Sequence, residues 1–194
     1  MSKAELTERG WRKRSGDIYT LEVAEGVFAW LGLNRASKHR PLLINPVAGV
    51  RHEATMRLCD EISQLPRTNM ATLSDPIRVL SGKTFDNLRI STLAEAPAAA
   101  EHLIEAVETY ALPFAHAYVD PDQLLAALGR RDHLPVSDYA IIRLPAMLAV
   151  LGRFEEALSA LDRELHTLHQ RSDPAAVGYR ASGAALRTWI AARS

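Results

Sequence analysis

The residues best suited to binding gather around two predicted strands near the start of the chain. They are seven cations or potential cations that flank these strands: Arg12, Lys13, Arg14, Arg35, Lys38, His39 and Arg40. If the strands pair as an antiparallel hairpin, the loop after the second returns to the end where the first began. Clustered cations at one end of a sheet attract anions. The sequence thus predicts a site for an acidic protein surface, nucleic acid or phosphate, with solvated turn charges as the alternative.

A second candidate site is the run Arg51, His52 and Glu53, where a predicted strand meets a predicted helix. The amides at a helix start and these side chains could bind an anion or perform general acid–base catalysis. Alternatively, Glu53 only favours the helix N-terminus, and the other two side chains lie in water. An enzyme requires His52 to point into a cavity, whereas an interaction module predicts an exposed His52. The sequence favours the exposed arrangement.

Three further patterns are assigned structural roles. The run Ser81 to Thr84 ends like a phosphate-binding loop, but Ile77 occupies the position of the required first glycine. His166 and His169 share a predicted helix face, yet two imidazoles alone do not make a metal site. Cys59 lies on an apolar helix face, where a lone cysteine is a small core residue. The sequence therefore predicts no metal site and no cofactor.

The composition is that of a chain that folds around a core. Hydrophobic residues make up 47% of the 194 positions, and the formal net charge is zero. The charge is uneven: residues 1–51 hold nine Lys and Arg against five Asp and Glu. Nucleic-acid-binding domains usually carry a net positive charge, so a protein partner is favoured over nucleic acid.

The same composition bears on location. The N-terminus is charged and lacks the apolar stretch of a secretory signal. No uninterrupted apolar stretch approaches the roughly 18 residues that a membrane span needs. Cys59 is the only cysteine, so the chain cannot form an internal disulfide. These features predict a cytoplasmic protein without a membrane partner.

The first half of the chain is predicted to be rich in strands. Alternating apolar residues indicate a strand at 17–23, which a turn at 24–26 joins to a second strand at 27–34. A third strand is expected at 42–50, at an edge or with a bulge, because Pro46 cannot donate a hydrogen bond. A helix follows at about 55–65. A second hairpin is expected from 77–80 and 84–91.

From about residue 95 the pattern is helical. One helix should end at Pro113, and others are expected at 121–129, 137–151, 154–169 and 174–192. Phe154, Leu158, Leu161 and Leu165 predict a buried stripe, and the run from Ala149 to Leu165 resembles the helix junction of a tetratricopeptide repeat. No second copy follows, so one closing helical hairpin is favoured.

Together these elements predict an α+β fold. We expect an antiparallel sheet of about four or five strands with helices on one face, followed by a C-terminal helical region. The predicted division is a sheet domain at 1–112 and a helical region at 113–194 packed on it, or one continuous domain.

Four runs carry a resemblance to a known family: GWRKRSGDIYTLE, FAWLGLN, INPVAGVRHE and YALPF. In their order they resemble a family of uncharacterised bacterial proteins with a domain of unknown function, over about residues 5–125. No activity or catalytic residue is established for that family. The resemblance implies at most an immunity- or antitoxin-like role.

The function expected from the sequence is a non-enzymatic interaction module that binds another protein. One alternative is a small enzyme with a pocket near Arg51, His52 and Glu53. A further alternative is an anion or nucleic-acid binder that uses the basic end of the sheet.

Overall fold

The computed structural model describes residues 3–36, 41–63, 69–134 and 140–194. The chain forms two compact units, each made of two segments. The sheet unit comprises residues 1–51 and 73–120, and the helical unit comprises residues 52–72 and 121–194. This division differs from the predicted single boundary at residue 112, because residues 52–72 group with the C-terminal helices.

The larger sheet of the sheet unit is five-stranded and antiparallel, with the order β1-β2-β3-β6-β7. Its strands are β1 (Arg12–Ser15), β2 (Ile18–Ala24), β3 (Val27–Gly32), β6 (Val47–His52) and β7 (Leu73–Pro76). The predicted hairpin is confirmed, since Tyr19 lies opposite Leu31 and Leu21 lies opposite Ala29. The short strand β1 was not predicted, because three consecutive cations have little strand propensity. An edge position tolerates them, since Arg12 and Lys13 remain in water.

The predicted third strand is divided between two sheets. Its first part is β5 (Leu42–Ile44), which lies in a small sheet between β4 (Arg35–Ala36) and β8 (Leu88–Ile90). Its second part is β6, which is an inner strand of the larger sheet rather than an edge. Pro46 lies in the break, where its missing N–H interrupts the ladder and the chain changes sheets. The Pro46 carbonyl accepts a hydrogen bond from Ile77 N at 2.9 Å.

The predicted hairpin of 77–80 and 84–91 is wrong. Residues Ile77–Leu80 form the short helix α3, and only Leu88–Ile90 are extended. Positive φ angles at Gly82 and Lys83 form a tight turn after α3. The apolar residues Ile77 and Leu80 are three apart, a spacing that places them on one face of a helical turn but on opposite faces of a strand.

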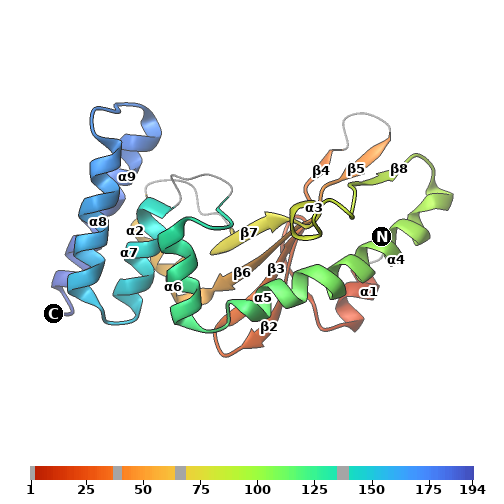
Figure 1. Ribbon diagram of the computed structural model, residues 1–194, viewed down its shortest axis with the longest axis horizontal. Coiled ribbons are helices and arrows are strands. Elements are labelled where there is room, and N and C mark those ends of the chain that lie inside the picture. Colours follow the sequence, from red (N-terminus) through yellow and green to blue (C-terminus); the bar gives the residue numbers. More distant parts are fainter. Residues whose placement is uncertain (1–2, 37–40, 64–68, 135–139) are drawn as a thin grey trace. The chain divides into compact units, whose positions relative to one another are not determined.

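A long helix with an internal irregularity lies on one face of the larger sheet. It consists of η1 (Leu93–Glu95), α4 (Ala96–Ala106), the π-helical segment η2 (Val107–Ala111) and α5 (Leu112–Ala117), which form a nearly continuous green ribbon in Figure 1. The prediction that Pro113 ends this helix is wrong. Leu112 N donates to Val107 O, five residues back, and this wider turn accommodates the proline without ending the helix.

The core of the sheet unit lies between this helix and the sheet. Side chains from one sheet face, including Tyr19 and Leu31, pack with Leu103, Val107 and Ala115. Trp11 and Leu6, from the N-terminal segment containing α1 (Lys3–Glu8), belong to the same cluster. The helix therefore covers one face of the sheet, as the sequence predicts.

The helical unit is built from five helices in the described part of the chain. They are α2 (Glu53–Ile62), α6 (Pro121–Arg130), α7 (Ala140–Val150), α8 (Phe154–Leu168) and α9 (Pro174–Ala191). Leu161 is fully buried, whereas Phe154, Leu158 and Leu165 are only half-buried. The buried face of α8 is shifted toward Ala157, Ala160 and Leu168. Cys59 is buried on α2, as predicted.

These observations confirm the α+β class with a helical C-terminal region. Residues 52–72 group with the C-terminal helices, which are distant in sequence. The periodicity of the sequence identified the helices and strands, but it did not show which of them belong to the same unit.

Candidate functional site

The cations of β1 lie on an open edge of the larger sheet. Among the described strands, β1 is terminal and pairs only with β2, with Arg12 opposite Thr20 and Lys13 opposite Tyr19. Arg12 and Lys13 are exposed, and Arg14 is half-buried. Arg12 and Lys13 form no side-chain hydrogen bond or ion pair with any residue that the structure describes. The edge thus presents two cations on a strand whose outer side pairs with no other described strand.

The structure brings part of the second cation group to the same end of the sheet. Asp17 follows β1, and its carboxylate binds Arg35 at 2.6 Å from Nε and 2.5 Å from Nη2. Such a two-point pair neutralises much of the charge of Arg35. Lys38, His39 and Arg40 lie outside the described residues. The positive charge of this end therefore comes mainly from β1 among the residues described.

His52 is the N-cap of α2, and the prediction that it is solvent-exposed is wrong. The ring is half-buried, its Nδ1 lies 2.8 Å from Thr55 Oγ1 and accepts from Thr55 N at 3.4 Å. The backbone N of His52 donates to Thr72 Oγ1 at 2.9 Å. Burial lowers the pKa of His52, because desolvation disfavours the charged imidazolium. Through these contacts His52 caps the N-terminus of α2. The sequence alone could not distinguish this structural role from a catalytic one.

Arg51 and Glu53, the neighbours of His52 in the chain, are the other two members of this candidate site. Glu53 is bound to Arg57 one turn along α2, at 3.1 Å. Arg51 is only 1% exposed. The His52 ring contacts a threonine hydroxyl, whereas an acid–base pair would require a carboxylate at this position. Thr72 is also fully buried, and its carbonyl accepts from the buried Arg143 at 2.9 Å. Thr72 therefore links the start of α2, through His52 N, to α7, through Arg143, within the helical unit.

The other sequence patterns have structural explanations. In the turn after α3, Ser81 Oγ accepts from Phe85 N at 3.0 Å, so its hydroxyl closes the turn. The ring of Trp30 lies against Gly32, where an added Cβ would be only 2.5 Å from the ring, so the ring fills this space. His166 and His169 have ring centroids 5.8 Å apart. Among the described residues, no three His, Cys, Asp or Glu side chains are placed to hold a metal ion.

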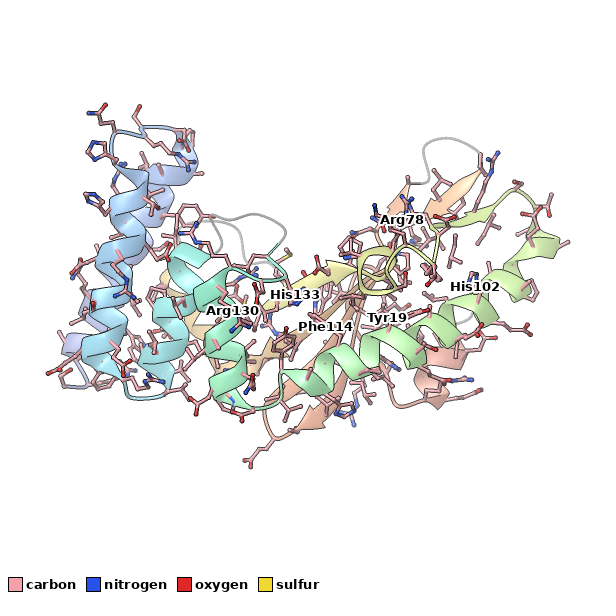
Figure 2. All side chains as sticks on the ribbon, viewed as in Figure 1. Tyr19, Arg78, His102, Phe114, Arg130 and His133 are labelled. Atoms are coloured by element: carbon pink, nitrogen blue, oxygen red, sulfur yellow. The ribbon has the colours of Figure 1, made fainter. Side chains whose placement is uncertain are left out.

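A hollow on the sheet unit was not predicted. It has a volume of about 160 Å³ and is lined by seven residues: Thr84, Phe85, His102, Glu105, Ala106, Thr109 and Tyr110. Figure 2 labels His102 on α4, and its ring lies 4.9 Å from that of Phe85, between centroids. The spacing of His102, Glu105 and Thr109 places them on one helix face, which the sequence could have shown. The turn that supplies Thr84 and Phe85 could not be placed, because 84–91 was predicted to be a strand.

Comparison of the chain with protein-family models, curated proteins and solved structures finds no match. The resemblance described above therefore stays a prediction, and no residue role is transferred from a relative. Within the described ranges, no helix combines the length and the apolar character that crossing a bilayer requires.

Proposed function

We propose that the protein is an interaction module that binds an extended, acidic segment of another protein along β1. The observation that supports this most directly is the open edge of β1, with Arg12 and Lys13 exposed and lacking side-chain partners among the described residues. A peptide can add a strand to such an edge through main-chain hydrogen bonds, while its side chains determine specificity.

Charge explains why the partner would be acidic. Cations on an edge strand discourage pairing with neutral or basic strands, which protects a monomer from edge-to-edge aggregation. The same cations favour a strand that carries carboxylates, because like charges directly opposite are destabilising and opposite charges stabilise the pair. Protection from aggregation alone is the competing role of these residues, and binding experiments distinguish the two.

The interface would be small, because β1 has four residues. A short added strand suits a weak and reversible complex rather than a permanent one. The immunity- or antitoxin-like role implied by the resemblance is a narrower form of this proposal. The lone buried Cys59 is compatible with the predicted cytoplasmic location.

The test uses a fluorescent peptide of alternating Glu and Val, with an otherwise identical Lys and Val peptide for comparison. Fluorescence anisotropy should show binding of the acidic peptide only, and the affinity should fall as salt is raised, because screening weakens exposed charge pairs. The double variant Arg12→Glu/Lys13→Glu should bind at least about tenfold more weakly at low salt.

The matched control is Lys83→Glu/Arg89→Glu, which changes the net charge equally at exposed positions away from β1. It should retain most of the affinity of the unmodified protein. Equal binding by the β1 double variant, or an equal loss in the control, would leave β1 with a protective role only.

A further inference from the structure

A second site, independent of the β1 edge, is the hollow between α4, η2 and the turn after α3. Its opening is polar: Thr84, His102, Glu105 and Thr109 are exposed, and Tyr110 is half-buried. Phe85 is buried and Ala106 completes the lining. All of these residues belong to the sheet unit.

The hydroxyl hydrogens in the hollow can be assigned from the hydrogen bonds. Thr84 Oγ1 donates to Ser81 O at 2.8 Å, so its one hydrogen is used. Thr84 Oγ1 and Tyr110 OH are 3.3 Å apart, and either could donate on geometry alone. Because the Thr84 hydrogen is committed, the phenol must donate to Thr84. The remaining capacity of both oxygens is therefore to accept hydrogen bonds.

Glu105 adds a charged acceptor to the same hollow. Its carboxylate is exposed and has no ion pair or side-chain hydrogen bond among the residues described. An ionised carboxylate accepts hydrogen bonds only, and such bonds are stronger when the donor is also charged. The polar lining is thus rich in acceptors, with one negative charge.

Aromatic side chains supply the second element of the site. The rings of Phe85 and His102 are tilted by 56° and 4.9 Å apart, and Tyr110 lines the same hollow. Aromatic faces attract organic cations more strongly than neutral groups of similar size. The volume of about 160 Å³ is close to the roughly 150 Å³ of an engineered protein cavity that holds benzene. It is sufficient for the head of a small organic cation.

We propose that this hollow binds an organic cation carrying N–H donors, namely an alkylammonium or guanidinium group. Its N–H groups donate to Glu105, Tyr110 and Thr84, and its apolar part lies against the rings. A free amine and a Lys or Arg side chain of a partner protein offer the same chemistry.

The first experiment titrates the full chain with n-butylammonium and ethylguanidinium chloride at constant ionic strength. Backbone NMR signals of Thr84, Thr109 and Tyr110 should shift to saturation with either salt. Tetramethylammonium, which lacks N–H donors, should bind about tenfold more weakly, because charged hydrogen bonds are lost. Neutral n-butanol should produce no saturable shift. Equal binding of butanol or tetramethylammonium would overturn the proposal.

A matched pair of variants tests the carboxylate. Glu105→Gln should weaken n-butylammonium binding about tenfold, since one charged acceptor becomes neutral. Glu101→Gln removes the same charge on an exposed residue of α4 that does not line this hollow, and should change binding less than about twofold. Tyr110→Phe should also weaken binding. Unchanged signals elsewhere confirm that each variant is folded, and unaltered binding by a folded Glu105→Gln protein would overturn the site.

The source of the cation is resolved by comparing free amines with blocked amino acids. Tighter binding of N-acetyl-lysine methylamide or N-acetyl-arginine methylamide than of the matching free cations indicates a partner side chain. Weaker binding of the blocked amino acids indicates a small amine. Both results support the cation chemistry, and neither depends on the β1 edge.

Discussion

In the helical unit, every described arginine has a hydrogen-bond partner, whereas β1 of the sheet unit presents Arg12 and Lys13 without one among the described residues. The two units come from one chain of ordinary composition. The comparison shows that open cations belong to the sheet unit, where exposed Lys83 likewise has no side-chain partner among the described residues, rather than to the chain as a whole.

The partners within the helical unit are of several kinds. Arg131 binds Glu164 at 2.7 Å, Arg187 binds Asp162, and Arg180 donates to the carbonyl of Arg171 at 2.7 Å. Exposed pairs such as Arg187 with Asp162 contribute little to stability, and they leave both charges with a partner. The helical unit is consequently a weaker candidate for recognising an anionic partner than β1.

The largest expected effect tests whether apolar packing, rather than these ion pairs, stabilises the helical unit. Leu161 is 0% exposed, so Leu161→Ala should reduce the free energy of unfolding by about 2–4 kcal/mol, through lost burial and a cavity. Urea denaturation measures the change. The control Leu151→Ala, at a position that is 37% exposed, should cost under about 1 kcal/mol. A similar small cost at Leu161 would show that this face of α8 is not packed.

The next effect compares one glycine from each unit. Gly32→Ala places a Cβ 2.5 Å from the Trp30 ring, and a buried ring cannot rotate away easily. The expected cost is about 1–3 kcal/mol. Gly183→Ala on α9 places a Cβ 2.9 Å from Leu165 Cδ1, the rotatable end of a half-buried side chain. Alanine also gains up to about 1 kcal/mol in helix propensity there, so the net change should be near zero.

Thermal and urea unfolding of the two glycine variants would decide between these outcomes. If Gly183→Ala cost as much as Gly32→Ala, the approach of α8 and α9 would be as rigid as the packing around Trp30. That result would show that the two units do not differ in how easily the packing around these glycines accommodates an added Cβ.

Local signals in the sequence predicted much of the helical unit and the central hairpin. Asp173-Pro174 marked the start of α9, where Asp173 accepts from Ala176 N at 3.1 Å. The hydrogen bond from Arg171, followed by that from Ala176 N, lowers the pKa of Asp173 to about 2. The alternating residues of 17–23 identified β2 because their period is that of a half-buried strand.

The missed features depend on contacts that are distant in sequence. The strand β1 is stabilised by pairing with β2 despite its poor propensity, and β5 and β6 separate because Pro46 interrupts the ladder. The hollow requires the turn at Thr84 and Phe85 to meet α4, a contact that no local pattern specifies. The sequence named the cations of β1 as binding candidates, but it did not predict that they lie on an edge strand.

A smaller effect tests the contribution of a paired charge in the helical unit. The Glu164 side chain is 13% exposed and binds Arg131, so Glu164→Gln should lower the free energy of unfolding by about 0.2–1 kcal/mol. Arg12→Gln should leave stability unchanged within about 0.3 kcal/mol, since no described partner is lost. Urea denaturation at low and high salt measures both. A larger loss for Arg12→Gln would indicate that this cation has a structural role, and would weaken the argument for β1 as a binding edge.

The smallest expected effect concerns the titration of His52, the N-cap of α2. Burial lowers its pKa in the folded protein below the ordinary value of about 6.5. As the pH falls below about 6.5, the unfolded chain binds a proton that the folded protein resists, so the contribution of His52 is complete above this pH and is lost as the pH falls through the folded pKa. His52→Asn keeps a side-chain acceptor for Thr55 N but removes the titration. The measurement is the free energy of unfolding of both proteins at pH 7.5, 6.5 and 5.5. The unmodified protein should lose more stability than the variant over this range, because the other acid-sensitive groups are shared and cancel in the difference. Parallel pH profiles would show that protonated His52 is tolerated at the cap, and that its ring is not held as an acceptor by Thr55.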